Sequence, residues 1–293
     1  MSENPVALCL AGHLSPEVAL ARLLLTGTPP EQIPAQLAPH EAPGNPAWHR
    51  LSALAARSDA LASLAAMLRE AEVDHDPVDP ATGATPESAI AAIARIFDRA
   101  VARAPEASVA AYSLNDPAIL AAATDEILAW LTRECLIAGD KDVLDLGCGI
   151  GRVAAALAPH CRSVLALDVS AGMIEEARRR HGHLPNLRFA TTPGTGLAGH
   201  PAAGFDLILA VDSFPYLVQA GIAESHMRDA AHLLRPGGAL AVLNLSYRGT
   251  PGADRADAAR WAAEGGWHLA HDGTTPFTLW DGRAFLFRRP RSP

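Results

Sequence analysis

The sequence has few of the residues that would commit it to several common classes of protein. It contains four cysteines among 293 residues, and their positions (Cys9, Cys135, Cys148 and Cys161) show no paired spacing. This argues against a disulfide framework and against a cysteine-type zinc site. Aromatic residues are also scarce, at 5% of the chain. No uninterrupted apolar run approaches the roughly 18 residues that a membrane span requires.

Positive charge is also in short supply. The formal net charge is -8, which argues against a general nucleic-acid surface because such surfaces carry a basic patch. The first residues, Met1 to Pro5, lack the basic region and the long apolar run of a signal peptide. We therefore expect a cytoplasmic protein with no nucleic-acid partner and no membrane partner.

What the sequence does contain begins with helical patterns. Ser15 offers an N-cap before a proline, and apolar residues follow at helical spacing up to Gly27. We expect a proline-rich loop over Thr28 to Pro46, and a longer amphipathic helix from Trp48 to Leu68. All periodicity then breaks over Val73 to Pro86.

This break is the predicted domain boundary. Residues 1–79 are expected to form a helical N-terminal domain, and residues 86–293 a second domain whose first part, 86–138, is a helical cap. Three aspartates surround His75 in the break. We interpret them as solvated linker acids, and no metal site is predicted anywhere in the chain.

The rest of the chain alternates short apolar runs with helical segments, which predicts an α/β fold with a mostly parallel, doubly wound sheet. A first strand is expected at residues 143–146, followed by strands at Ser163–Asp168, Leu187–Thr191, Phe205–Val211, Ala239–Ser246, Trp267–His271 and Arg283–Arg288. Helices are expected at Pro86–Arg103 and Asp116–Leu136 in the cap, from Ile150 onward, and at Ala171–Arg180, Gly221–Leu234 and Asp254–Glu264. Residues 139–293 should therefore form a Rossmann-like, seven-stranded core.

The most informative stretch runs from Asp142 to Arg152, where a buried strand leads into a glycine turn and then a helix. Gly147, Gly149 and Gly151 alternate, so the backbone can turn sharply and lie close against a ligand. A dinucleotide fingerprint places its third glycine three residues after the second. Here Arg152 occupies that position, so a dinucleotide site is not indicated.

Two acids accompany this turn. Asp145 lies inside the strand, where it is poorly placed beside a pyrophosphate but well placed to attract an ammonium group. Asp168 ends the next strand, at about the spacing expected of a ligand for ribose hydroxyls. A nucleoside with a cationic amino-acid tail fits these acids better than NAD does, and S-adenosylmethionine is such a molecule.

Four motifs, in order over about residues 110–289, resemble those of the class I S-adenosylmethionine-dependent methyltransferases of small-molecule type. They are the glycine turn, the acid after the second strand with a helix that carries Met173, the fourth strand from Phe205 to Asp212, and the turn from Leu233 to Leu240 into the fifth strand. The resemblance implies that the last strand runs antiparallel between the fifth and the sixth.

The resemblance also implies that S-adenosylmethionine is the cofactor. The glycine turn would cradle its methionine part, Asp145 would act on its amino group, and Asp168 would take both ribose hydroxyls. The implied cofactor-binding residues are Tyr112, Asp145, Gly147, Cys148, Gly149, Gly151, Asp168, Val169, Met173, Gly194, Thr195 and Val211. Tyr112 is included as a lid contact, although a tyrosine packed on the sheet explains it equally well.

One position departs from the family pattern. After the third strand the family commonly has an acid that meets the adenine amino group, and the segment from Phe189 to Leu197 has none. We therefore assign adenine recognition to backbone groups near Gly194 or to the hydroxyl of Thr195.

Asp212 and Tyr216 follow the fourth strand and are the candidate catalytic residues. Either could accept a proton from the acceptor, and either could instead shape the pocket. Asn244, Ser246 and Tyr247 end the fifth strand on the same side of the expected sheet. The segment from Asp212 to Tyr216 is not the tetrapeptide used on flipped bases, which disfavours nucleic-acid methylation.

We therefore expect a methyltransferase that acts on a small-molecule substrate, with the methylated atom unresolved. Two alternatives stay open. One is non-methylating use of the same cofactor, by cyclisation or alkyl transfer, and the other is a cofactor-binding partner protein without turnover. A homodimer is also left open.

Overall fold

A computed structural model of the chain describes residues 4–57, 59, 61–62, 64–66 and 85–291. Their contacts divide them into two compact units. The first, here the helical unit, takes its residues from Met1–His75, Arg99–Glu126 and Phe277–Asp281; the second, the sheet unit, takes its residues from Asp76–Asp98, Ile127–Pro276 and Gly282–Pro293. The predicted break over residues 73–86 lies, up to residue 84, outside the described residues, and the boundary drawn there stays a prediction.

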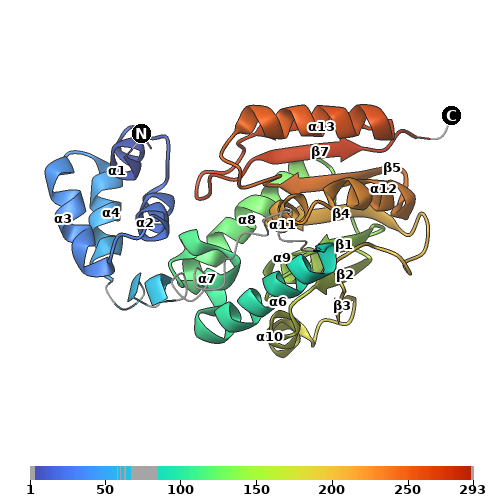
Figure 1. Cartoon of the computed structure of the whole chain (residues 1–293), viewed down its shortest axis with the longest axis horizontal. Coiled ribbons are helices and arrows are strands. Elements are labelled where there is room, and N and C mark those ends of the chain that lie inside the picture. Colours follow the sequence, from blue (N-terminus) through green and yellow to red (C-terminus); the bar gives the residue numbers. More distant parts are fainter. Residues whose placement is uncertain (1–3, 58, 60, 63, 67–84, 292–293) are drawn as a thin grey trace. The chain divides into compact units, whose positions relative to one another are not determined.

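The helical unit is built from short helices (Figure 1). They are α1 (Pro5–Leu10), α2 (Pro16–Leu25), η1 (Pro30–Gln32), α3 (Ile33–Leu37), η2 (Ala38–His40), α4 (Pro46–Ala55), α7 (Pro105–Val109), η4 (Ala111–Ser113) and the first part of α8 (Pro117–Arg133). The start predicted for α2 is confirmed, since the Ser15 hydroxyl accepts a hydrogen bond from the backbone N–H of Val18 at 3.1 Å.

The loop expected over Thr28 to Pro46 is wrong, because η1, α3 and η2 lie within it. Its prolines occupy the first turns of these short helices, where a missing N–H costs nothing. Ile33 and Leu37 supply the buried face of α3. α1 was not predicted either, and it begins where the Asn4 side chain accepts hydrogen bonds from the first backbone N–H groups of the helix.

The single helix expected from Trp48 to Leu68 is also wrong, because α4 ends at Ala55. The described residues 59, 61–62 and 64–66 are helical again after this interruption. Ser58 and Asp59 are residue types that favour a helix N-terminus in a sequence. Apolar spacing alone does not show where one helix ends and the next begins.

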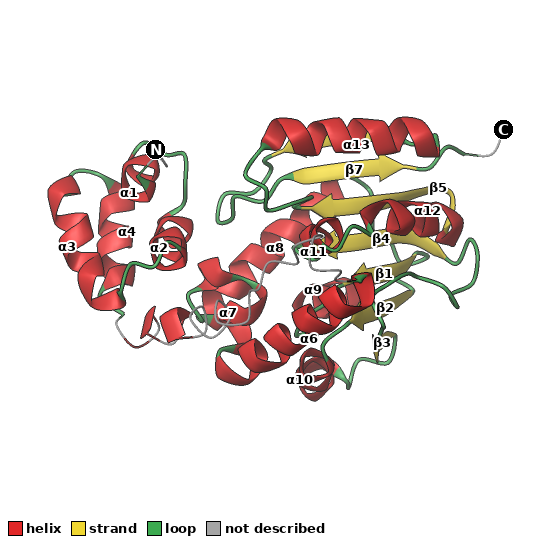
Figure 2. Cartoon of the chain, in the orientation of Figure 1, coloured by secondary structure: helices red, strands yellow, loops and turns green. Residues whose placement is uncertain are grey.

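The sheet unit contains a seven-stranded sheet with the strand order β3-β2-β1-β4-β5-β7-β6 (Figure 2). The strands are β1 (Asp142–Leu146), β2 (Ser163–Asp168), β3 (Leu187–Thr191), β4 (Phe205–Val211), β5 (Leu234–Leu243), β6 (His268–Thr274) and β7 (Ala284–Arg288). β7 pairs antiparallel with β5 and β6, and the other neighbouring strands are parallel. This confirms the Rossmann-like α/β fold, with the last strand between the fifth and the sixth.

Helices cover the sheet, and its central strands are therefore buried. α6 (Pro86–Arg103), α11 (Phe214–Gln219), α12 (Ala223–Leu233) and α13 (Pro251–Gly265) contribute to one apolar cluster together with strand residues such as Leu144, Leu146 and Ile208. Side chains alternate along a strand, so Val143 and Asp145 point to the opposite face. The connections after β1 and β2 are α9 (Arg152–Leu157) and α10 (Ala171–His181).

Most of the predicted elements of this unit are confirmed, and the differences have local causes. β5 stops at Leu243 rather than Ser246, because Asn244 adopts a left-handed backbone conformation with φ 68°. The sequence analysis did not predict α11, which has six residues and a proline in its first turn.

The segment between β6 and β7 belongs to the helical unit. The Glu126 carboxylate of α8 accepts hydrogen bonds from the backbone N–H groups of Thr278 and Leu279, at 3.0 and 3.1 Å. The Trp280 ring stacks on Tyr112 with the ring centroids 6.0 Å apart, and both rings are buried. A late part of the chain therefore completes a core that consists mainly of early helices.

An ion network joins the starts of four strands at the amino edge of the sheet. Asp142 accepts hydrogen bonds from Arg162 (2.9 Å to Nε), Ser163 (2.6 Å) and Arg235 (2.8 Å). Arg235 also pairs with Asp206, which accepts a bond from the backbone N–H of Asp142 at 2.8 Å. Chiefly because Arg162 bonds to it, the pKa of the Asp142 carboxyl lies well below its usual range.

We expect Arg235→Ala to lower the free energy of unfolding of the sheet unit by about 2–3 kcal/mol, because it leaves two carboxylates without their shared partner. Urea unfolding at pH 7 would measure this. The matched control is Arg22→Ala, which breaks the exposed pair with Asp281 and should cost less than about 1 kcal/mol.

The lowered pKa of Asp142 also predicts how the stability contributed by this network changes with pH. The network stabilises the fold at every pH above the unfolded-state pKa of roughly 3.9, and this stabilisation is lost as the pH falls through the folded value. The difference between Arg235→Ala and the parent should therefore shrink below pH ~4. Equal losses from both arginine variants at pH 7 would contradict the assignment.

Candidate cofactor and acceptor site

The glycine turn connects β1 to α9 and lies tightly against neighbouring elements. Gly147, Gly149 and Gly151 have positive φ angles of 75°, 53° and 79°, which favour glycine. A Cβ atom on Gly147 would lie 2.2 Å from Cβ of Ser213, at the start of α11. On Gly151 it would lie 2.7 Å from the Phe189 ring of β3. The sequence therefore requires glycine at these two positions for close packing as well as for the turn.

Asp145 stands beneath this turn as a buried acid. Its side chain belongs to a residue that is 2% exposed, and its Oδ2 atom has no hydrogen-bond partner. Burial raises the pKa of the carboxyl to about 7, an effect that Arg152 opposes and Asp168 reinforces. A buried carboxylate oxygen without a donor is costly unless a cation or another donor completes it.

Asp168 lies at the carboxyl end of β2 and ties the turn to the neighbouring strand. Its Oδ2 accepts a hydrogen bond from the Gly149 N–H at 2.8 Å, and its Oδ1 accepts one from the Ser170 N–H at 2.9 Å. Burial raises the pKa of this carboxyl, while the backbone hydrogen bonds oppose the rise. The residue is 8% exposed, and each carboxylate oxygen can accept a further hydrogen bond.

The residues that follow Asp168 form the start of α10 and receive a contact that the sequence did not indicate. Asp98, on α6, accepts hydrogen bonds from the Ser170 hydroxyl at 2.6 Å and from the Gly172 N–H at 2.9 Å. The Ser170 hydroxyl in turn accepts from the N–H of Met173, which is buried. Asp98 is thus a further acid near the turn, reached across 70 residues of sequence, and no local signal could have found it.

The segment after β3 is where the family acid is missing. Gly194 is buried with φ 73°, and its Cβ position would lie 2.5 Å from Val169 and 2.8 Å from Ile90 of α6. Its N–H donates to the Thr192 hydroxyl at 3.3 Å. Thr195 is half-buried beside it. The structure therefore brings the candidate residues Val169 and Gly194 together and adds Ile90, which the sequence analysis did not single out.

The acceptor candidates lie at the carboxyl ends of β4 and β5. Asp212 and Asn244 both have positive φ angles, 55° and 68°. The Asn244 amide donates to Oδ1 of Asp212 at 2.7 Å, and the Tyr247 hydroxyl donates to the same oxygen at 3.1 Å. The structure thus brings Asp212 together with Asn244 and Tyr247, whereas the Ser246 hydroxyl donates to Asp254 at 2.6 Å instead.

Tyr216, on α11, lies among other aromatic rings in this region. Its ring makes edge contacts with Phe97 and Tyr247, at centroid distances of 5.3 and 5.8 Å. Burial raises the pKa of its phenol well above the usual value, and the Asp212 carboxylate adds to the rise. A phenol with a raised pKa stays protonated at neutral pH and so offers no phenolate to accept a proton, which favours a hydrogen-bonding or packing role for Tyr216.

Comparison with known proteins identifies a methyltransferase domain within the chain. A family model described as a methyltransferase domain matches residues 143–238, the stretch from β1 into β5 that holds the glycine turn and both acids. This domain belongs to the class I S-adenosylmethionine-dependent methyltransferases. The family's cofactor is S-adenosylmethionine, as the sequence analysis expected.

Curated relatives agree with this assignment. The chain is 32% identical over 135 residues to the methyltransferase GfsG of Streptomyces halstedii, covering 45% of this chain and 47% of that protein. It is 30% identical over 135 residues to the S-adenosyl-L-methionine-dependent Diels-Alderase iccD of Talaromyces variabilis, covering 45% and 44%. The chain thus spans about half the length of the curated relatives it matches.

Solved structures support the fold. Phosphoethanolamine N-methyltransferase 1 of Haemonchus contortus has a TM-score of 0.55 against this chain at 17% sequence identity, covering 72% of this chain and 51% of that one. At this level of identity the likeness shows that the two proteins share a fold, and no more.

Two of the predicted cofactor-binding residues, Tyr112 and Cys148, have packing contacts of their own. Tyr112 lies in the helical unit, where it packs on Trp280, and its role as a lid contact stays a prediction. Cys148 is buried within the turn, and burial raises the pKa of its thiol, which suits a packing role. Among the residues that the structure describes, no group of three or more His, Cys, Asp or Glu side chains could hold a metal ion. Nor is any described helix long and apolar enough to cross a bilayer.

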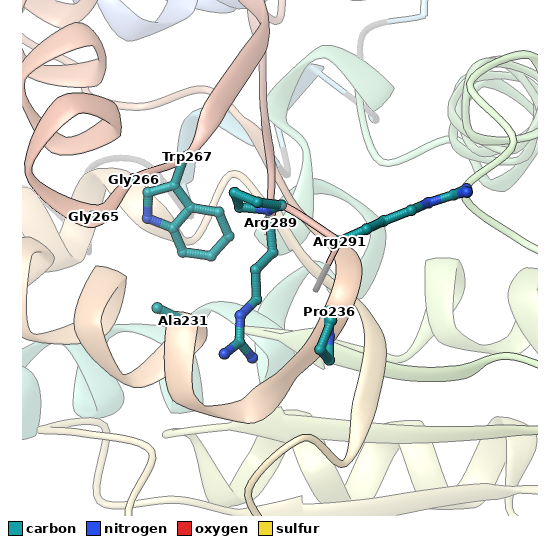
Figure 3. A pocket seen from close by; sticks show the side chains of 8 residues that line it. Ala231, Pro236, Gly265, Gly266, Trp267, Arg289 and Arg291 are labelled. Carbon is teal, nitrogen blue, oxygen red and sulfur yellow. The ribbon is translucent and has the colours of Figure 1, made fainter. Parts of the chain in front are cut away.

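A separate pocket lies at the opposite edge of the methyltransferase sheet, where β5 begins and β7 ends (Figure 3). Its volume is about 360 Å³, and Trp267, Arg289 and Arg291 contribute the largest side chains. Arg289 donates a hydrogen bond to the Leu234 carbonyl. No predicted site residue lines this pocket, so it is not the cofactor site.

Proposed function

We propose that the chain transfers a methyl group from S-adenosylmethionine to a small-molecule acceptor at the carboxyl edge of the sheet. The observation that carries the proposal is the buried Oδ2 atom of Asp145, which lacks a donor beneath a glycine turn. The ammonium group of the cofactor is a donor of the right charge for this oxygen. The residues of the site therefore fit the family's cofactor.

The proposal gives each cofactor residue a role. Asp145 binds the ammonium group, with the turn residues Gly147, Cys148, Gly149 and Gly151 around the methionine part. Asp168 accepts hydrogen bonds from the ribose hydroxyls, in addition to those that it takes from the Gly149 and Ser170 N–H groups. Because those two backbone bonds fix the carboxylate, it is held in position before the cofactor arrives.

The adenine end is assigned to an apolar surface. Val169, Met173, Gly194, Thr195 and Val211 are the predicted contacts, and Ile90 joins them because it packs on Gly194 beside Val169. The segment after β3 supplies backbone groups and hydroxyls in place of the missing acid. This makes shape and desolvation the main sources of adenine affinity.

The cofactor supplies the methyl group and its own leaving group, so the protein has three tasks: positioning, exclusion of water and, for some acceptors, removal of a proton. We assign proton removal or acceptor orientation to Asp212, which lies on the same edge as the glycine turn. Tyr216 orients the acceptor or packs against it. The proposal includes a cytoplasmic location and excludes nucleic acid as the acceptor, on the acidic balance of charge.

Asp168→Ala should weaken binding of S-adenosylmethionine and of S-adenosylhomocysteine by about 1.5–3 kcal/mol, or roughly 10- to 150-fold, because the variant loses charge-assisted contacts to ribose. Titration calorimetry measures the change. The matched control is Glu175→Ala, which removes an exposed acid from α10 and should leave the affinity unaltered. Equal affinities for parent and Asp168→Ala would overturn the cofactor assignment.

A second candidate is cyclisation with the cofactor bound but not consumed. The match to a curated Diels-Alderase at 30% identity favours it. Incubation with labelled cofactor and a metabolite library separates the candidates by their products. Methyl transfer releases S-adenosylhomocysteine, alkyl transfer releases methylthioadenosine, and cyclisation leaves the cofactor unchanged while a substrate disappears.

A further inference from the structure

The pair formed by Asp212 and Asn244 has a fixed polarity. Asn244 comes directly after β5 and donates from Nδ2 to Oδ1 of Asp212 at 2.7 Å. The orientation of an amide side chain has to be inferred from its partners. Here the partners leave no choice, because the other end of the amide, Oδ1, accepts a hydrogen bond from the Arg283 backbone N–H at 2.9 Å. If the amide flipped, its NH₂ group would face that N–H.

The backbone holds the same side chain in place. The Asn244 N–H donates to the Arg283 carbonyl at 2.8 Å, so both Asn244 and its amide are tied to the residue that precedes β7. Its φ of 68° is left-handed, a conformation that asparagine tolerates better than most residues. Asp212 has the same backbone state at the end of β4, with its N–H bonded to the Leu243 carbonyl at 2.9 Å. Two adjacent strands therefore end in the same way, with their side chains hydrogen-bonded to each other.

We propose that Asn244 is a positioning residue for Asp212: locked by Arg283, it fixes the carboxylate at the acceptor site and stabilises its ionised form. This inference rests on the proposed function. A neutral donor to a carboxylate favours the charged state, and the Tyr247 hydroxyl acts in the same direction. The Asp212 carboxylate also lies close enough to the Tyr216 phenol to raise its pKa. The Arg283 guanidinium donates to the Gly273 carbonyl.

The first test is a direct titration of the Asp212 carboxyl by carbon NMR in the cofactor-free protein, with the signal assigned from Asp212→Asn. In Asn244→Ala the titration midpoint should rise by about 1–2 pH units relative to the parent, because the donor to the charged form is lost. Asn186→Ala is the matched control. It deletes an amide that donates to the carbonyls of Ala158 and Cys161, and it should lower stability without moving the midpoint. An unchanged midpoint in Asn244→Ala would overturn the proposal.

The second test places a carboxylate at both positions of the pair and then exchanges the two residues. Asn244→Asp keeps an oxygen for the Arg283 N–H but places a second carboxylate beside Asp212, so the two must share a proton. Its turnover should fall at least 10-fold at pH 7, with an acid limb that moves to higher pH and an unaltered cofactor affinity. The double variant Asp212→Asn, Asn244→Asp restores one donor and one acceptor. It should recover the melting temperature of the parent but not its turnover.

The outcomes also separate this inference from the proposed function. If Asn244 only stabilised the end of β5, Asn244→Asp would show the pH profile of the parent, and that result would sink the positioning role. If the parent releases no S-adenosylhomocysteine with any acceptor, the proposed function fails. The NMR midpoint still decides whether Asn244 controls Asp212 in that case.

Discussion

Replacing Asp212 with asparagine should reduce turnover by roughly 10²- to 10⁴-fold if the acceptor must lose a proton, the range that a positioned general base contributes. The substitution preserves the size of the side chain and removes its capacity to accept a proton. Cofactor affinity should change little, because the variant keeps the glycine turn, Asp145 and Asp168, to which the cofactor contacts are assigned. Turnover is measured as transfer of a labelled methyl group, and affinity is measured by calorimetry.

Two further variants make this result interpretable. Tyr216→Phe removes a phenol whose raised pKa argues against a base, so it should cost less than Asp212→Asn. Asp125→Asn removes an exposed acid on α8 and should match the parent. If the acceptor is a thiolate or an already ionised carbon, positioning is sufficient. Turnover of both Asp212→Asn and Tyr216→Phe within a few-fold of the parent would then exclude a base at either position.

Asp145→Asn should weaken S-adenosylmethionine binding by about 30- to 150-fold at pH 7.5, since the ammonium group would lose its buried counter-charge, a loss of about 2–3 kcal/mol. Asparagine keeps one oxygen in place, so the effect isolates the charge. Gly147 and the other turn residues are unaffected by the change. Calorimetry on this variant, with Glu175→Ala as the control for charge loss, gives the size of the effect.

The affinity for S-adenosylmethionine should also depend on pH, because Asp145 must be ionised to pair with the ammonium group. The pKa of Asp145 is raised to about 7 by burial, so below that pH the site must release a proton before it binds a cation. The dissociation constant should then rise toward tenfold per pH unit as the pH falls from 7 to 5.5. Above pH ~8 the cofactor's own amino group loses its proton, so affinity should be highest between pH 7 and 8.

In Asp145→Asn, the loss of cofactor affinity below pH ~7 should disappear, and the loss above pH ~8 should remain. A parent protein whose affinity is constant from pH 5.5 to 7.5 would show that Asp145 is not the partner of the ammonium group. The same flat profile would leave the ribose assignment of Asp168 standing, because that assignment is measured separately.

The parts of the fold that the sequence predicted correctly are those with local signals. The α2 start follows from a serine and a proline that are neighbours in the sequence, and the glycine turn is a single short stretch. α6 was predicted with its bounds unchanged because a proline begins it and a continuous apolar spacing follows. The position of β7 came from resemblance to the family, since no spacing in the sequence reveals which strand pairs with which.

The errors have a common physical origin. α3 lies in a proline-rich stretch that was expected to be a loop, and α11 was not predicted at all; each has a proline in its first turn, where proline is acceptable. Their stability comes from burial of side chains such as Ile33 and Phe214 against distant residues, and sequence periodicity over five or six positions cannot show this.

The same limit applies to the site. Asp145 and Asp168 could be singled out because each stands at a strand position with a recognisable spacing. Asp98 and Ile90 could not, because what matters is their contact with Ser170 and Gly194, far along the chain. The pairing of Asp212 with Asn244 depends on β4 and β5 being neighbours, which only the topology establishes.

The segment Phe277–Asp281 belongs to the helical unit, and this affects how the protein can be divided into fragments. A fragment that begins at Pro86 would retain this segment but lose α2, whose N-cap residue Ser15 donates a hydrogen bond to the Leu279 carbonyl. A fragment of the early helices alone would lack the Trp280 ring from its interior. Neither fragment contains a complete helical unit, so its stability and activity have to be measured on the full chain.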